Sequence, residues 1–326
     1  MKALSIPQTD MVVSRIAYGC LMIGGGWNHN PLTPQIRRDA MRIIQTALDA
    51  GINFFDHADI YLYGKSEEVF ADLWQEQPHL RDKIYVQSKC GIRMTGDPYP
   101  GVPQHYDFTN EHIVRSVEGS LRRLKTDYLD CLLLHRPDAL VEPEEVAKAF
   151  SDLHASGKVR YFGVSNHTPA QMDLLRAYLD QPLVFNQLEI NLIHTHLLDE
   201  GIVLNQDNPA RPVRGEGTLE YCRLHKITIQ PWSPLAMGKL TGRKDVSLTG
   251  SQMEAADLVA EMAAAKNVSP EGILIAWLLR HPALMQPIVG TTNPKRLLAA
   301  CEADDIELSR EEWYQLFTAG RGNPVP

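Results

Sequence analysis

Short apolar segments alternate with amphipathic segments eight times along this chain of 326 residues, and this alternation constrains the fold more than any other feature. The two kinds of segment are typical of strands and helices, respectively. The segment at 128–134 is almost entirely apolar, as expected of a strand that is covered on both faces of a parallel sheet. Length alone would allow two domains, but no linker interrupts the series. We therefore expect one α/β domain over residues 1–326, a closed (β/α)8 TIM barrel rather than an open doubly wound sheet.

The expected strands span residues 12–20, 52–55, 83–88, 128–134, 159–164, 183–186, 227–230 and 286–289. Helices are expected at 33–51, 66–74, 109–125, 143–155, 217–224 and 269–279, and after Thr168 and Asn293. Thr33-Pro34 and Thr168-Pro169 are good helix starts, because Thr caps the first N–H groups and Pro suits the first helical position. The residues before 12 are predicted to add an N-terminal hairpin, and an extra C-terminal helix follows Ser309.

The polarity of the chain changes abruptly where each expected strand ends. Asp56, Lys89 and His135 follow the second, third and fourth strands, and Tyr61 comes five residues after Asp56. Active sites of such barrels lie at the carboxyl ends of the strands, so we expect these four side chains to converge. Each residue alone has an ordinary alternative, since an Asp at a strand end more often caps the following turn.

These four side chains suit the protonation of a carbonyl oxygen. A tyrosine with a pKa near ~10 is a poor acid at neutral pH. We expect the Lys89 ammonium to lower the pKa of Tyr61, and Asp56 to hold that ammonium in place and charged. His135 could orient the carbonyl oxygen by a hydrogen bond. A serine nucleophile elbow and metal-ligand spacings are absent from the sequence, so we expect no metal site, and a bound hydride carrier would complete a reduction.

Seven motifs resemble the aldo-keto reductase superfamily, in order and over essentially the whole chain. They are FDHADIY (55–61), VQSKCG (86–91), LLLHRPD (132–138), GVSN (163–166), NQLEIN (186–191), PWSPLAMGKL (231–240) and IVGTTNPKR (288–296). The DHADIY and SKCGI segments are most similar to a bacterial branch of YdhF-like oxidoreductases. The resemblance implies a barrel that is a monomer or a weak homo-oligomer and reduces a small carbonyl compound with NADPH, without a Rossmann domain.

The resemblance also implies roles for individual residues. Asp56, Tyr61, Lys89 and His135 would form the catalytic tetrad, with Tyr61 as the general acid. The implied cofactor-binding residues fall into four groups: Ser165, Asn166 and Gln187 for the nicotinamide carboxamide; Trp232 for stacking on the nicotinamide; Ser233, Leu235 and Gly238 for the pyrophosphate; and Gly290, Thr292, Arg296 and Arg243 toward the adenosine and its 2′-phosphate.

The sequence departs from the family pattern at two places. Ala299-Ala300 stands where the family commonly has a Glu-Asn pair, which puts the adenine contacts and the strength of the preference for NADPH over NADH in doubt. Tyr61 is followed by Leu62-Tyr63 rather than by Gly. Tyr63 could be mistaken for the acid, but its spacing from Asp56 favours Tyr61.

Composition narrows the partners and the compartment. The net charge of −8 argues against nucleic acid and anionic membranes as the main partner, and no apolar run is long enough for a membrane span. The five cysteines are widely spaced without a C-x-x-C pair, which favours a reducing, cytoplasmic location.

Three functions compete at this point. The first is an NADPH-dependent carbonyl reductase, and the second is a cofactor-binding regulatory or redox-sensing subunit with little turnover. The third is a lyase or isomerase that uses Lys89 as a Schiff-base amine, which a charged, Asp-paired Lys89 would disfavour.

Overall fold

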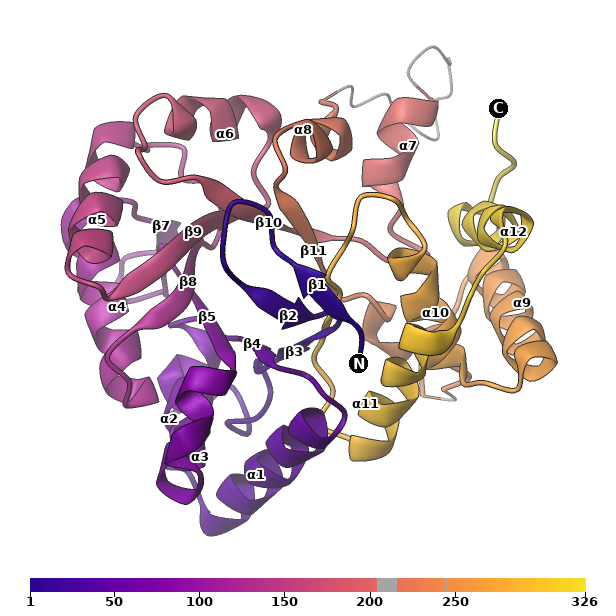
Figure 1. Cartoon of the computed structure of the whole chain (residues 1–326), viewed down its shortest axis with the longest axis horizontal. Helices are drawn as coiled ribbons and strands as arrows, with labels where there is room; N and C mark the ends of the chain where they lie inside the picture. Colours follow the sequence, from indigo (N-terminus) through magenta and orange to yellow (C-terminus); the bar gives the residue numbers. More distant parts are fainter. Residues whose placement is uncertain (204–215, 244) are drawn as a thin grey trace.

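The computed structural model describes residues 1–203, 216–243 and 245–326, and these form a central eight-stranded sheet surrounded by helices (Figure 1). The strands are β3 (Ala17–Gly19), β4 (Phe54–Asp56), β5 (Tyr85–Cys90), β8 (Leu129–Leu134), β9 (Val159–Ser165), β10 (Leu183–Glu189), β11 (Thr228–Trp232) and β12 (Ile288–Val289). All pairs of neighbouring strands are parallel, in the order β11-β10-β9-β8-β5-β4-β3-β12. The two ends of this series meet where Gln286 N donates to Ile229 O at 3.0 Å. The sheet is thus almost closed, which confirms the predicted α/β TIM barrel.

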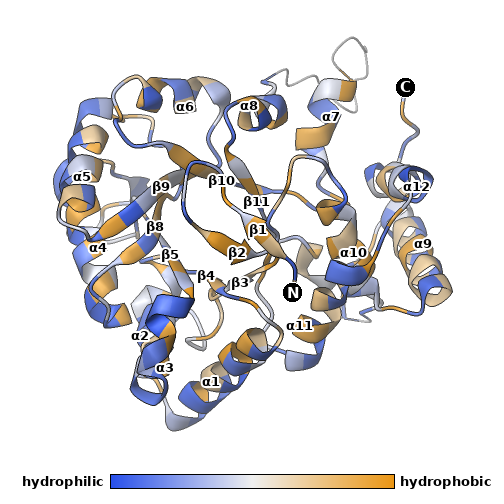
Figure 2. Cartoon of the chain, viewed as in Figure 1, coloured by the Kyte–Doolittle hydropathy of each residue, from blue (hydrophilic) through white to orange (hydrophobic). Residues whose placement is uncertain are grey.

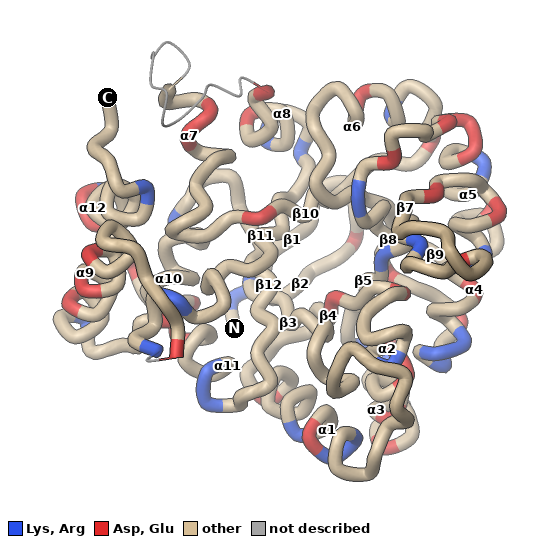
Figure 3. Tube along the Cα trace, turned by 180° about the vertical axis from the view of Figure 1, so that it is seen from behind, with Lys and Arg blue, Asp and Glu red and all other residues tan. Residues whose placement is uncertain are grey.

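The helices lie outside the sheet, and many of them carry apolar residues on their inner side (Figure 2). Most Lys, Arg, Asp and Glu residues lie on these outer elements and their connections (Figure 3). They are α1 (Pro34–Asp49), α2 (Lys65–Phe70), α3 (Asp72–Glu76), α4 (Asn110–Leu124), α5 (Pro143–Ala155), α6 (Pro169–Arg176), α7 (His196–Ile202), α8 (Thr218–Leu224), α9 (Gly250–Lys266), α10 (Pro270–Leu279), α11 (Pro294–Cys301) and α12 (Arg310–Arg321). Thr33 caps α1 and Thr168 forms a capping box on α6, as predicted. Among the described residues, no helix has the length and apolarity needed to cross a membrane.

A hairpin covers the amino-terminal end of the barrel. Its strands β1 (Ala3–Ser5) and β2 (Val12–Ser14) are antiparallel, and Figure 1 shows it lying across the sheet. Met11 and Val13 are each 1% exposed and belong to a core cluster inside the barrel that includes Phe54. The expected single strand at 12–20 is therefore wrong. Its first part belongs to this hairpin and only its last part, β3, to the barrel.

Other element boundaries also differ from expectation. The expected helix at 66–74 is divided into α2 and α3. Strands β5 and β10 continue through the polar residues that we expected to end them, because their neighbours continue too: Lys89 pairs with Leu133, and Glu189 pairs with Trp232. A long connection after β5 also contains a small hairpin of β6 (Ile92–Arg93) and β7 (His105–Tyr106).

Candidate active site

The four expected tetrad residues meet at the carboxyl ends of three adjacent strands. Asp56 is the last residue of β4, Lys89 lies in β5 and His135 directly follows β8. Lys89 Nζ donates to Asp56 Oδ1 at 2.7 Å, to Asp56 Oδ2 at 2.8 Å and to Tyr61 OH at 3.1 Å. The rings of Tyr61 and His135 are 5.9 Å apart and nearly perpendicular. The structure therefore places all four side chains in one contiguous cluster.

An unusual turn after β4 directs Tyr61 into this cluster. Tyr61 begins the short 3₁₀ helix η1 (Tyr61–Gly64), in which Leu62 and Tyr63 have left-handed φ values of 52° and 59°. Consecutive left-handed residues that are not glycine cost free energy and occur most often at functional sites. Leu62 is buried and Tyr63 is 42% exposed. Of the two tyrosines, it is Tyr61 whose hydroxyl contacts Lys89.

Burial governs the protonation of Tyr61 and Lys89. Burial raises the pKa of Tyr61, and the nearby Lys89 ammonium opposes this effect only in part, so the pKa lies above its usual value. Lys89 thus lowers the pKa of Tyr61 as expected, but the pKa does not fall below its usual value, because desolvation of the phenolate is the larger effect. Burial alone would lower the pKa of Lys89, but Asp56 and Tyr61 raise it above its usual value. Tyr61 is therefore a protonated phenol, and Lys89 a charged ammonium, at neutral pH.

His135 is a neutral imidazole in this setting. Burial lowers its pKa well below the usual value, and the positive charges of Lys89 and Arg136 lower it further. Its backbone N–H donates to Cys90 O at 2.9 Å, which fixes the residue at the end of β8. Its Nδ1 has no hydrogen-bond partner among the described residues. A neutral imidazole keeps one N–H, which suits a hydrogen bond to a carbonyl oxygen.

A chain of buried glutamines, which the sequence analysis missed, supports Asp56 from inside the barrel. Gln87 Nε2 donates to Asp56 Oδ1 at 2.6 Å and to Gln230 Oε1 at 2.9 Å. Gln230 Nε2 donates to Gln286 Oε1 at 2.9 Å, and Gln286 Nε2 donates to Ser14 O at 2.9 Å. The available signal was a glutamine within or just before three of the apolar strands, β5, β11 and β12.

Four residues expected to bind the nicotinamide lie together at the ends of β9, β10 and β11. Asn166 Nδ2 donates to Ser165 Oγ at 2.7 Å, and Trp232 Nε1 donates to Asn166 Oδ1 at 3.2 Å. Gln187 Nε2 donates to Asp56 Oδ1 at 3.1 Å, which joins this group to the tetrad. A hydroxyl and two amides offer both donors and acceptors to a carboxamide, and the half-buried indole offers an aromatic face. These groups fit a nicotinamide.

The loop after β11, which was expected to bind the pyrophosphate, contains left-handed residues. Ser233 and Gly238 have left-handed φ values of 50° and 79°, and Leu235 between them packs against the core. Such turns can direct backbone N–H groups toward an anion, but the N–H of Gly238 donates to Leu235 O at 2.7 Å. Arg243 lies beyond this loop, where its Nε donates to Asp245 Oδ1 at 2.9 Å. Arg243 is therefore already paired with a carboxylate.

The residues expected near the adenosine lie on and before α11. Gly290, Thr292 and Arg296 are all exposed, so Arg296 could reach a phosphate. Ala300, in contrast, is fully buried and packs in the core. This position of α11 contributes to stability and offers no side chain to an adenine.

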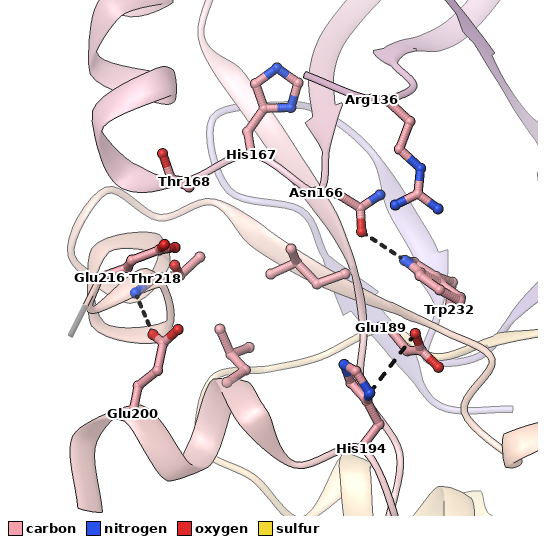
Figure 4. Close-up of a pocket in the computed structure, with 12 residues that line it drawn as sticks. Arg136, Asn166, His167, Thr168, Glu189, His194, Glu200, Glu216, Thr218 and Trp232 are labelled. Carbon is pink, nitrogen blue, oxygen red and sulfur yellow. Dashed lines mark hydrogen bonds and ion pairs between the residues drawn. The ribbon is translucent and has the colours of Figure 1, made fainter. Parts of the chain in front are cut away.

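A cavity of about 310 Å³ adjoins these groups. Figure 4 shows Arg136, Asn166 and Trp232 at one end, Glu189 beside them, and Glu200 near the other end. The Arg136 guanidinium lies 5.5 Å from the centre of the Trp232 ring. Arg136 and Glu189 stand within two recognised motifs, but the sequence analysis gave them no role.

Comparisons with known proteins agree on the family. The model of the aldo/keto reductase family matches residues 15–319. The uncharacterized oxidoreductase YcsN of Bacillus subtilis is 36% identical, with 97% of both chains covered. Oxidoreductase YdhF of Escherichia coli is 38% identical over 89% of this chain and 90% of its own. A 6-dehydroglucose reductase of Agrobacterium fabrum is 35% identical over 96% of both chains.

A solved structure agrees with the fold. The glycerol dehydrogenase of Gluconobacter oxydans superposes with a TM-score of 0.81 at 26% identity, and the match covers 99% of this chain and 97% of that one.

Proposed function

The chain belongs to the aldo/keto reductase family, and from this premise we propose that it reduces an aldehyde or ketone to an alcohol with NADPH. The observation that carries the proposal is the contact of Lys89 Nζ with both Tyr61 OH and Asp56 at the carboxyl ends of the strands. A protonated phenol held by a fixed ammonium suits a general acid.

The geometry supports the following roles in this reaction. Bound NADPH would supply the hydride that adds to the carbonyl carbon. Tyr61 OH donates its proton to the carbonyl oxygen, so that hydride and proton together give the alcohol. Lys89 stabilises the resulting phenolate, and Asp56 keeps Lys89 charged and oriented. His135 donates a hydrogen bond to the same oxygen and holds it beside Tyr61. Solvent then returns a proton to Tyr61.

The cofactor would be held by residues of three strands and one helix. Ser165, Asn166 and Gln187 would bind the carboxamide, and Trp232 would stack on the nicotinamide ring. The loop after β11 and the exposed Arg296 would bind the phosphates, as the family resemblance implies.

The experiment that tests the proposal is a stoichiometric assay with a panel of aldehydes and ketones. We expect NADPH consumption to equal alcohol formation, with NADH giving a lower kcat/KM. NADPH binding without alcohol formation on any carbonyl compound would contradict the proposal and support a regulatory subunit. A Schiff-base reaction is disfavoured, because Asp56 and Tyr61 raise the pKa of Lys89 despite its burial.

A further inference from the structure

The cavity that Asn166 and Trp232 line (Figure 4) is also lined by Arg136, the residue directly after His135. Arg136 forms no ion pair or side-chain hydrogen bond with any residue that the structure describes, although it is half-buried. Its one recorded contact is the face of the Trp232 ring, 5.5 Å from its guanidinium carbon. A guanidinium presents five N–H donors, and partly buried donors without partners are costly. Arg136 therefore has donors to offer to a ligand in the cavity.

A hydrogen-bond acceptor, the carboxylate of Glu189, also lines the cavity. Glu189, in β10, has a carboxylate oxygen 4.0 Å from His194 Nδ1, which is beyond hydrogen-bond distance. Figure 4 shows Glu189 and His194 below the pair of Arg136 and Trp232. The cavity thus combines a donor-rich and an acceptor-rich side chain close to the proposed site of hydride transfer.

The charge around the cavity argues against an anionic ligand. Among the residues that the structure describes, its lining contains three carboxylates, Glu189, Glu200 and Glu216, against the single guanidinium of Arg136. Burial lowers the pKa of the lining residue His167 to about 4, so this imidazole adds no positive charge at neutral pH. An apolar ligand would remove water from Arg136 and Glu189 without replacing the lost hydrogen bonds. Hydroxyl groups, which both donate and accept, suit this mixture of partners.

We propose that the substrate is a neutral polyhydroxylated carbonyl compound, with Arg136 donating to its hydroxyl groups and Glu189 accepting from them. This inference rests on the proposed function and names the substrate class of the same site. Its carbonyl oxygen lies between Tyr61 and His135, and its hydroxyl-bearing carbons extend into the cavity. Arg136 follows His135 immediately, so one backbone segment positions both the carbonyl oxygen and the adjacent hydroxyl groups.

The test compares matched pairs of substrates that differ in their hydroxyl groups. Two ratios of kcat/KM are measured: glyceraldehyde over propanal, and erythrose over butanal. Each ratio is determined for the wild type, for Arg136→Gln and for Glu189→Gln. We expect both ratios to exceed one in the wild type. Each variant should lower them by about tenfold, since each loses a hydrogen bond between a charged group and a hydroxyl.

Arg122→Gln is the matched control, because Arg122 is an exposed arginine at the end of α4, and it should leave both ratios unchanged. Thermal melting and NADPH titration of each variant establish that it is folded and binds cofactor. Succinic semialdehyde, a carboxylate-bearing aldehyde, tests the anionic alternative.

Three outcomes would overturn the inference. Ratios near one in the wild type, or ratios that Arg136→Gln does not change, would remove the hydroxyl-binding role while leaving the reductase function intact. A preference for succinic semialdehyde that Arg136→Gln abolishes would instead assign Arg136 to an anion. Absence of turnover with every carbonyl compound would overturn the proposed function, and this inference with it.

Discussion

At the scale of single residues, burial fixes the protonation states around Lys89. Tyr61 keeps its proton and His135 stays neutral because burial disfavours the charged form of each side chain. Lys89 is the exception, since its contacts with Asp56 and Tyr61 outweigh its burial. The site therefore combines a proton donor, a neutral hydrogen-bond donor and one fixed positive charge at neutral pH.

His57, next to Asp56, should make the protein sensitive to acid. Its ring is fully buried, packs on Phe70 and has no hydrogen-bond partner among the described residues. Burial, with a smaller contribution from Lys89, lowers its pKa to about 3. Its pKa in the unfolded chain is near ~6.5, so unfolding takes up a proton between these values. The contribution of His57 to the free energy of unfolding is fully present above about pH 6.5. It falls by roughly 1.4 kcal/mol per pH unit as the pH decreases toward 3.

His57→Leu should flatten this dependence, because leucine cannot take up a proton. We expect the melting temperature of the variant to fall less than that of the wild type between pH 7 and pH 4.5. Parallel declines in the two proteins would show that His57 does not carry the acid sensitivity.

Arg296 should select NADPH over NADH, because it is an exposed arginine of α11, whereas Arg243 is already paired with Asp245. Arg296→Ala is expected to raise KM for NADPH far more than KM for NADH. Equal effects on both cofactors would remove Arg296 from the 2′-phosphate site.

At the scale of elements, the strands determine which side chains can meet. Most strand positions could be predicted because short apolar runs such as 128–134 are typical of buried strands. Asp56, Lys89 and His135 could be predicted to converge because each follows or ends such a run, and the carboxyl ends of parallel strands lie at one end of a barrel. The glutamine chain through Gln87 and Gln230 could not, because pairing between side chains of distant strands depends on the closed barrel. The raised pKa of Tyr61 likewise depends on its burial in the folded protein, which the sequence does not reveal.

Gly163 in β9 should be intolerant of any side chain. A Cβ there would lie 2.6 Å from Leu133 Cδ2 and 2.8 Å from Phe185 O, on the two neighbouring strands. Gly163→Ala is expected to destabilise the protein by about 1–3 kcal/mol, measured by urea unfolding. Gly250→Ala is the control, because no described atom lies within 4 Å of a Cβ at the start of α9. Equal stability of the two variants would contradict this account of the close approach of β8, β9 and β10.

At the scale of the whole molecule, one end of the barrel carries the proposed active site and the other end is closed. The carboxyl end carries the tetrad and the cavity, while the hairpin of β1 and β2 covers the amino end. Gln286, which bonds Ser14 O, links this hairpin region to the glutamine chain below Asp56. The stability of the closed end and the geometry of the active end are thus physically connected.

Two adjacent valines of β2 offer a matched test of the hairpin. Val13 is 1% exposed and belongs to the core cluster inside the barrel, whereas Val12 is 50% exposed. Val13→Ala should destabilise the protein by about 2 kcal/mol, from lost burial and the cavity that remains. Val12→Ala should change the stability by less than about 0.5 kcal/mol. Equal losses in thermal unfolding would show that the hairpin does not close the barrel core.

The central claim, that Tyr61 is the proton donor of a carbonyl reductase, is tested most directly by NADPH oxidation with an activated aromatic aldehyde. The measurement compares the wild type with Tyr61→Phe and includes an NADPH titration of both. We predict that the variant binds NADPH as the wild type does and loses about 10² to 10⁴-fold in kcat, the usual contribution of general acid catalysis. Turnover by Tyr61→Phe within a few-fold of the wild type would contradict the account.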